Sequence, residues 1–135
     1  MRLGIDATNI GGGGGITHLK EMINAVTNTD NLYGITEIIV FSSHNVLNEI
    51  ADNSILKKVS FKSLNQGLIK RVKFQIFSYD KEINKYCDIL FSLTGDYIGK
   101  FKPIIGMSQN MLLYERDIWR DIKSPKEIMR FWLNF

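Results

Sequence analysis

The 135-residue chain is poor in cysteine, having only Cys87. A single cysteine cannot form an internal disulfide, and its surroundings do not suggest a metal cluster. Cys87 lies in the apolar segment CDILFSL, so we expect a small buried side chain rather than a reactive one. This cysteine usage predicts a reducing, cytosolic compartment.

Long apolar runs are also absent. The N-terminal sequence MRLGIDATN lacks the pattern of a secretory leader, because Asp6 arrives before an apolar region could form. No stretch reaches the ~18 to 20 apolar residues that a membrane span requires. We therefore expect a cytoplasmic protein that is soluble or, at most, peripheral on the inner face of the membrane.

A strong excess of one charge is missing as well. The chain has 17 Lys and Arg against 14 Asp and Glu, a formal net charge of +3. A nucleic-acid-binding domain usually concentrates far more positive charge, so we expect no nucleic-acid partner. The mild balance fits solubility, anionic ligands or a membrane surface. With 44% hydrophobic and 23% charged residues, the composition is that of a globular domain.

The order of the apolar segments predicts an α/β fold. Strands are expected at 2–7, 37–42, 56–61, 87–93 and 102–107, with helices at 16–28, 45–51 and 66–86. This alternation predicts a Rossmann-like parallel sheet with helices on both faces. In the longest helix, one apolar stripe holds Leu68, Val72, Ile76, Tyr79, Ile83 and Tyr86.

Five consecutive glycines, residues 11–15, separate the first strand from the first helix. We call this segment the glycine loop. Glycines permit positive φ and let a ligand approach the backbone, and a helix N-terminus favours anions. Thr17 and His18 follow in the first turn. We predict a ligand-binding role for the loop, Thr17 and His18, against the alternatives of a flexible connector and, for His18, a structural role.

The glycine loop fails both nucleotide-binding motifs. The dinucleotide pattern needs glycines at i, i+2 and i+5, and from Gly11 the last position is Ile16. The phosphate-binding P-loop needs Lys then Ser or Thr after its last glycine, but Ile16 and Thr17 follow Gly15. No acidic residue ends the second strand, at Phe41 and Ser42. NAD binding is therefore disfavoured, and a sugar or phosphate ligand remains.

The segments MRLGIDATNIGGGGGITHLKEMI and CDILFSLTGDYIGKFKPIIGMSQNMLLYE resemble bacterial glycosyltransferases of family 4, which have the GT-B fold. Such enzymes have two Rossmann-like domains, an N-terminal one for the acceptor and a C-terminal one for the nucleotide-sugar. The resemblance covers only the N-terminal half of such an enzyme. Relatives often have NMLPFE where this chain has NMLLYE, so Leu113 and Tyr114 depart from the pattern.

The resemblance implies roles for the matched positions. Gly12, Gly13, Gly14 and Gly15 would line the cleft near the donor phosphates and the acceptor. Asn110 would lie near the transferred sugar, and Glu115 would order its loop or contact a hydroxyl. Thr94 and Gly95, after the fourth strand, would face the same cleft. Asn110 and Asp6 are the weak candidates for catalysis.

The resemblance also implies what the 135 residues lack. The whole chain would be a truncated acceptor-side domain, without the donor-binding domain and its basic and acidic pairs. The apolar ending MRFWLNF, in a helix expected from Ser124 and Pro125, agrees with a chain that packs against something further. The donor would be a nucleoside-diphosphate sugar and the acceptor a glycan or lipid-linked glycan. We expect no metal, no bound cofactor and an inactive isolated chain.

Several other polar residues have two interpretations. Asp6 could be a base for the acceptor hydroxyl, but we favour a structural bond to backbone N–H groups of the glycine loop. His44 is expected at the surface or as a helix cap, and Asp96 in a turn.

A basic cluster, mixed with Phe74 and Phe77, could rest on an anionic membrane or simply be a solvated surface. Its members are Lys57, Lys58, Lys62, Lys70, Arg71 and Lys73.

Two other functions remain open at this point. A non-catalytic Rossmann-like module could bind a sugar phosphate or a protein partner. A nicotinamide-dependent dehydrogenase is already disfavoured by the failed glycine pattern.

Overall fold

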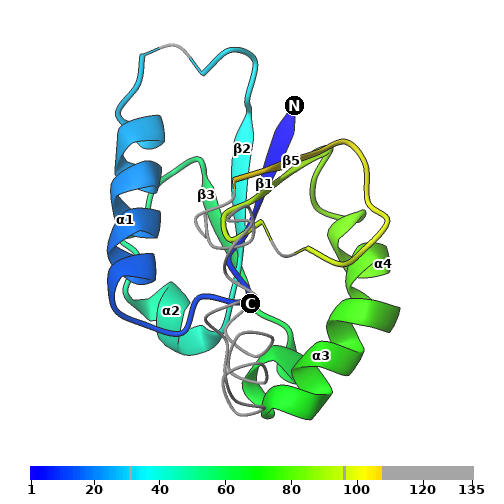
Figure 1. Ribbon diagram of the computed structural model, residues 1–135. Helices are drawn as coiled ribbons and strands as arrows, with labels where there is room; N and C mark the ends of the chain where they lie inside the picture. The colour runs from blue at the N-terminus through cyan, green and yellow to red at the C-terminus, as the bar shows by residue number, and fades with distance from the viewer. Residues whose placement is uncertain (31, 96, 108–135) are drawn as a thin grey trace, which may run out of the picture.

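A five-stranded, all-parallel sheet with strand order β3-β2-β1-β4-β5 forms the centre of the protein (Figure 1). The computed structural model describes residues 1–30, 32–95 and 97–107. The alternation of strands and helices is that of a Rossmann-like α/β fold, as predicted. The elements are β1 (Arg2–Asp6), α1 (Gly14–Thr27), β2 (Glu37–Phe41), α2 (His44–Asn48), β3 (Leu56–Val59), the 3-10 helix η1 (Lys62–Asn65), α3 (Leu68–Phe77), α4 (Tyr79–Ile83), β4 (Ile89–Ser92) and β5 (Ile104–Gly106).

Helices cover both faces of this sheet, with α1 and α2 on one side and α3 and α4 on the other (Figure 1). Along β2, Ile38 and Val40 join the core under α1 and α2. Ile39 and Phe41 point the opposite way, into a core with residues of α4. Side chains alternate along a strand, so a strand covered on both faces must be apolar at every position.

The strand order reverses between β1 and β4. The chain passes from β1 to β2 and β3, then crosses back to place β4 on the free side of β1. The register of these two strands sets Asp6 beside Ser92, at the carboxyl end of the sheet. In open α/β sheets, ligands bind outside the carboxyl ends of the strands at such a reversal. The topology therefore directs attention to the segments that follow β1 and β4.

The first helix begins earlier than its sequence suggests. It was expected from Ile16, but α1 starts at Gly14, with Gly13 as its N-cap. Gly14 and Gly15 thus form the first helical turn rather than a loop. Glycine has a poor helix propensity, which hides this start in the sequence. Packing of the buried Leu19 and Ile23 against the sheet stabilises the helix nonetheless.

The long helix expected over 66–86 is wrong in two respects. It is divided at Ser78, whose φ of −128° departs from helical geometry, into α3 and α4. Its apolar stripe is right only in the second half, where Tyr79 and Ile83 are buried. In the first half, three residues of the predicted stripe are exposed by 38 to 54%, namely Leu68, Val72 and Ile76.

Two contacts explain why α3 turns a different side inward. The Phe74 ring lies 5.2 Å from that of Phe61 and 5.8 Å from that of Tyr79, so an aromatic cluster fixes it. The neighbouring Gln75 is buried and bonds to the segment after β1. A buried amide with hydrogen-bond partners thus outweighs the apolar periodicity of α3.

The remaining boundaries differ by a few residues. β3, β4 and β5 are each shorter than expected, and α2 begins at His44 rather than Asn45. His44 is exposed, in agreement with the predicted surface position. Cys87 is buried and its side chain is 3% exposed, as expected. Among the described residues, no helix is both long enough and apolar enough to cross a lipid bilayer.

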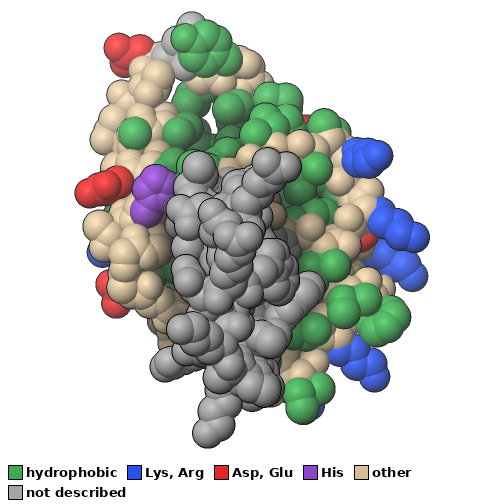
Figure 2. Space-filling view, in the orientation of Figure 1, with side chains coloured by type: hydrophobic (Ala, Val, Ile, Leu, Met, Phe, Trp, Pro, Cys, Tyr) green, Lys and Arg blue, Asp and Glu red, His purple; other side chains and the backbone are tan. Residues whose placement is uncertain are grey.

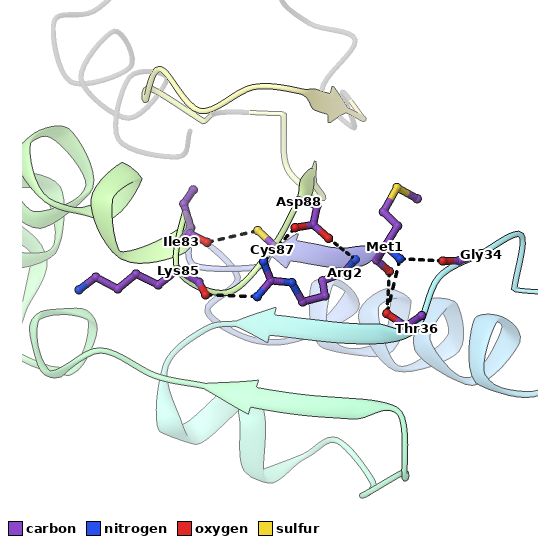
Figure 3. A network of polar contacts seen from close by, with 8 residues as sticks. All are labelled: Met1, Arg2, Gly34, Thr36, Ile83, Lys85, Cys87 and Asp88. Atoms are coloured by element: carbon purple, nitrogen blue, oxygen red, sulfur yellow. Dashed lines mark hydrogen bonds and ion pairs between the residues drawn. The ribbon is translucent and has the colours of Figure 1, made fainter.

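The amino end of the sheet, where the strands begin, is closed by contacts within the chain (Figure 3). The Arg2 guanidinium forms an ion pair with Asp88 at 2.9 Å and donates to the Lys85 carbonyl at 3.3 Å. The Met1 ammonium donates to the Gly34 carbonyl at 2.8 Å. These contacts fix the start of β1 to the segments before β2 and β4.

Candidate functional site

The glycine loop lies at the carboxyl end of the sheet (Figure 1). Residues 11–13 connect β1 to α1, and Gly14 and Gly15 are the first residues of α1. At Gly11, Gly12 and Gly14, an added Cβ would meet no atom of the described residues within 4 Å. Gly13 differs because its φ of 60° favours glycine. At Gly15, a Cβ would lie 3.2 Å from the Ile10 side chain. The fold thus explains why glycine is needed at Gly13 and, in part, at Gly15, but it gives no reason for glycine at Gly11, Gly12 and Gly14.

The first turn of α1 presents backbone donors to the same region. The Ile16 and Thr17 N–H groups donate to the Gly13 carbonyl at 3.2 and 3.4 Å. The N–H groups of Gly14 and Gly15 come too early in the helix to have an acceptor inside it. No acidic side chain occupies this turn. The end of the helix therefore retains its positive partial charge, which favours an anionic ligand.

Thr17 and His18, both predicted to bind ligand, occupy this turn and are exposed.

Asp6, at the end of β1, belongs to a buried polar cluster. Its side chain is 3% exposed. The Asp6 Oδ1 accepts hydrogen bonds from the Thr8 N–H at 3.2 Å, the Thr8 hydroxyl at 2.7 Å and the Tyr79 hydroxyl at 3.0 Å. These bonds support the structural interpretation of Asp6, although the N–H group is that of Thr8, just before the glycine loop.

The Tyr79 hydroxyl remains a hydrogen-bond donor in this environment. Burial, followed by the nearby Asp6 carboxylate, raises the pKa of Tyr79 well above its ordinary value of 10.0. Both causes oppose the negative charge of a tyrosinate. Tyr79 therefore stays protonated and holds the Asp6 carboxylate from the α4 side.

A second tie connects α3 to the segment that leads into the glycine loop. The Gln75 Nε2 donates to the Thr8 hydroxyl at 2.8 Å and to the Asn9 Oδ1 at 3.1 Å. We refer to Asp6, Thr8, Asn9, Gln75 and Tyr79 as the polar cluster. It fixes the path of the chain immediately upstream of the glycines, with α3 and α4 as supports.

Arg71 lies one helical turn before Gln75, on the same side of α3. Its Nε is buried and has no hydrogen-bond partner in the part of the chain that the structure describes. The sequence groups Arg71 with the other cations of the basic cluster, but in the structure it is less exposed than Lys70 and Lys73. A guanidinium with an unused donor can supply charge to an anion.

The segment after β4 forms the other side of the site. Thr94 is half-buried, and Gly95 is exposed with a φ of 71°. The adjacent Ser92 is buried beside Asp6, and its hydroxyl has no partner among the described residues. Because Asp6 and Ser92 are paired in register, the predicted residues Thr94 and Gly95 leave the sheet next to the start of the glycine-loop segment.

The connection from β4 to β5 is anchored to α4. Asp80 accepts hydrogen bonds from the Tyr97 hydroxyl and, at 2.6 Å, from the Lys100 N–H. Burial and the bond to Asp80 raise the pKa of Tyr97. The Tyr97 hydroxyl also accepts from the Phe101 N–H at 3.2 Å. One carboxylate on α4 thereby orders the chain that follows Thr94 and Gly95.

A small recess opens between the polar cluster and this connection. Its volume of about 10 Å³ suits a single water-sized group. The lining residues are Asp6, Asn9, Gln75, Tyr79, Tyr97 and Ile98. The recess can therefore accept a hydroxyl group, whereas a larger ligand would have to lie outside it.

Some predicted site residues fall outside the described part of the chain, namely Asp96, Asn110 and Glu115. Sequence reasoning missed Thr8, Asn9, Gln75 and Tyr79 as a group, and it treated Arg71 as a surface charge. One available signal was Gln75, the single uncharged polar residue of α3. Gln75 lies four residues before Tyr79, which is buried, and this spacing could have indicated that the Gln75 amide also points into the protein.

Neither a metal centre nor a known relative adds to this picture. Among residues 1–30, 32–95 and 97–107, no group of three or more His, Cys, Asp or Glu side chains could hold a metal ion. Comparisons of the chain with protein-family models, curated proteins and solved structures found no match.

Proposed function

We propose that this chain is the acceptor-side, N-terminal domain of a GT-B glycosyltransferase. The parent enzyme would transfer a sugar from a nucleoside-diphosphate sugar to an acceptor hydroxyl, in polysaccharide, lipopolysaccharide or other glycoconjugate synthesis. The observation that carries the proposal is the set of three glycines, Gly11, Gly12 and Gly14, that the fold does not require, at the strand reversal of the sheet.

Unrequired glycines are unfavourable, because each increases the conformational entropy that is lost on folding. An alanine at Gly11, Gly12 or Gly14 would meet no neighbouring atom. A reason outside the described contacts is therefore needed. Close approach of a ligand to the backbone supplies that reason, and the reversal between β1 and β4 is where α/β sheets bind ligands.

The charges of the site suit a diphosphate. Negative charge develops on the leaving nucleoside diphosphate as the sugar departs, and fixed donors stabilise it without reorganisation. The N–H groups of Gly14 and Gly15 and the unpaired Nε of Arg71 are such donors. Under this proposal, the donor-binding domain contributes the remaining positive charge, and no metal ion is needed.

Asp6 has a positioning role in this proposal. Its carboxylate is buried and accepts hydrogen bonds from Thr8 and Tyr79. A general base must reach the proton that it removes, and the recess that Asp6 lines is only large enough for a water-sized group. We therefore assign Asp6 to ordering the segment before the glycines, and we propose Thr17, His18, Thr94 and Gly95 as contacts for the acceptor.

Turnover by the complete gene product, assayed with a panel of nucleoside-diphosphate sugars, tests the proposal. Gly12→Ala should reduce turnover by about tenfold or more, because a methyl group would stand where the ligand meets the backbone. Its thermal stability should stay unchanged. Asn24→Ala, on an exposed part of α1 away from the loop, is the matched control and should retain activity. Full turnover by Gly12→Ala would contradict the assigned position of the ligand.

The alternative is a non-catalytic module that binds a sugar phosphate or a protein. The reading frame beyond codon 135 separates the two, since a second α/β domain is required for sugar transfer by a GT-B enzyme. In the alternative, ¹⁵N-labelled chain titrated with sugar phosphates should show shifts at Gly14 and Gly15, with no turnover by the complete gene product.

A further inference from the structure

The outward side of α3 carries an unusual concentration of exposed apolar side chains. Within ten residues, five large apolar side chains are 38 to 84% exposed. They are Leu68, Ile69, Val72, Ile76 and Phe77, with Ile69 at 84% and Phe77 at 69%. Single exposed apolar residues are common on protein surfaces, but a contiguous group usually marks a contact surface.

Helical geometry places these side chains together. Ile69 and Ile76 are seven residues apart, two turns of one side, and Leu68 and Val72 lie next to them. Phe77 follows beyond Lys73 around the helix. The opposite side of α3 carries Phe74 and Gln75, which pack against the protein. We call the set Leu68, Ile69, Lys70, Val72, Lys73, Ile76 and Phe77 the α3 outer face.

Positive charge borders the apolar side chains. Lys62, Lys70 and Lys73 are exposed, and none forms an ion pair with a described residue. α3 contains no acidic residue. Figure 2 shows hydrophobic and basic side chains gathered on the side of the molecule where α3 and α4 lie. The face therefore combines an apolar strip with unpaired cations.

An open groove runs beside this strip. It has a volume of about 250 Å³ and is lined by Ser63, Lys70, Lys73, Phe74, Phe77 and Ser78. Two ammonium groups and two hydroxyls around an aromatic floor match a phosphate group attached to an apolar tail. This chemistry is that of an anionic lipid headgroup at a bilayer surface.

We propose that the α3 outer face docks on an anionic lipid bilayer, independently of the proposed sugar transfer. α3 lies in the plane of the interface, with Ile69, Ile76 and Phe77 inserted among the headgroups. Lys70 and Lys73 extend their ammonium groups to lipid phosphates. Arg71 takes no part, because its Nε is buried and the residue lies on the same side of α3 as Gln75.

Charge favours an anionic membrane over two other possible partners of the α3 outer face, the C-terminal segment and a second copy of the chain. The C-terminal segment, residues 123–135, contains Lys123, Lys126 and Arg130 against the single acid Glu127. Packing that segment on α3 would bring like charges together. A second copy of the chain would likewise set two basic faces against each other. An anionic membrane instead attracts the lysines, by about 1 kcal/mol for each cation near its surface.

Flotation of the full chain with vesicles tests the proposal. We expect binding to vesicles of phosphatidylcholine mixed with phosphatidylglycerol, little binding to phosphatidylcholine alone, and weaker binding as salt is added. Lys70→Ala combined with Lys73→Ala should lower the partition coefficient roughly thirtyfold at low salt. The matched control is Lys100→Ala with Lys102→Ala, which removes the same charge from the β4–β5 connection and should have a much smaller effect.

The apolar contribution is tested by Ile69→Ser combined with Phe77→Ser, against Tyr33→Ser as a control with an equally exposed side chain. The double variant should lose binding while its circular dichroism spectrum is retained, since both side chains are exposed. Equal binding to neutral and anionic vesicles, no binding, or equal losses in the controls would overturn the proposal. The proposal would also be overturned by a concentration-dependent dimer of the wild type that the double variant does not form. Protection of α3 from hydrogen exchange that is lost when residues 123–135 are removed would overturn it as well.

Discussion

The two ends of the sheet differ in how completely the chain satisfies its own groups. At the amino end, Arg2, Asp88 and the Met1 ammonium all have partners within the protein (Figure 3). At the carboxyl end, the Arg71 Nε and the Ser92 hydroxyl are buried without a hydrogen-bond partner among the described residues. Buried polar groups are usually hydrogen-bonded, so the described contacts stabilise the amino end more completely than the carboxyl end.

Glycines show a related contrast. In the middle of β1, a Cβ on Gly4 would lie 2.6 Å from the Cys87 Sγ and 3.0 Å from the Phe41 ring. Beyond the carboxyl end of β1, a Cβ on Gly12 would meet no described atom within 4 Å. Close packing therefore explains Gly4 but not Gly12. Each prediction below tests one side of this comparison.

The largest effect on stability is expected at Asp6, a residue at the carboxyl end of the sheet whose hydrogen bonds stabilise the fold. Asp6→Ala leaves the Thr8 N–H, the Thr8 hydroxyl and the Tyr79 hydroxyl without a buried acceptor. We expect the free energy of unfolding to fall by about 3 kcal/mol, measured by urea denaturation. Tyr79→Phe removes one donor and should cost only about 1 kcal/mol. Equal stability of Asp6→Ala and wild type would refute the structural role of this carboxylate.

The same substitution at two glycines gives the next largest effect. Gly4→Ala should destabilise the protein by about 2 kcal/mol, because the methyl group overlaps Cys87. Gly12→Ala should change stability by less than about 0.5 kcal/mol. Thermal melts of both variants provide the comparison.

A rescue experiment identifies the cause at Gly4. Adding Cys87→Ala to Gly4→Ala removes the sulfur atom and should restore part of the lost stability. If Gly12→Ala proved as damaging as Gly4→Ala, the distinction between the packed interior of β1 and the glycine loop would fail.

The smallest effect is expected at the exposed ion pair of the amino end. Hydrogen bonds from Arg2 lower the pKa of Asp88 below its usual value. A carboxyl group with a lowered folded-state pKa adds stability above its unfolded pKa, about 3.9, and loses it as pH falls through the folded value. The difference in the free energy of unfolding between wild type and Asp88→Asn should thus be small at neutral pH and should disappear in acid. A difference that widened below pH ~4 would contradict this linkage.

Much of the fold could be predicted because its signals are local. The apolar segment at 38–41 predicted a strand buried on both faces, and the glycines marked the turn between β1 and α1. The start of α1 at Gly14 could not be predicted from propensity, since tertiary packing of Leu19 and Ile23 decides it. Likewise, the side that α3 buries depends on Phe74 and Gln75, whose partners are distant in sequence.

The candidate site was predictable only in part, for the same reason. The glycine loop was evident as a composition anomaly within one segment. The polar cluster was not, because its bonds connect Thr8 with Gln75 across 67 positions and Asp6 with Tyr79 across 73. No periodicity encodes such a pairing. Only the crossover that places α3 and α4 against the carboxyl end of β1 brings these side chains together.

The hydrogen bonds of Gln75 have a thermodynamic consequence. Its amide donates hydrogen bonds to Thr8 and Asn9 just before the glycine loop, while the next residue, Ile76, is exposed on the outer side of the same helix. Ligand binding at the glycine loop and membrane binding at the α3 outer face would therefore both act on α3. If a ligand that reorders the glycine loop displaces α3, a membrane bound to α3 must change the affinity for that ligand. By linkage, the ligand must change the affinity for the membrane by the same factor.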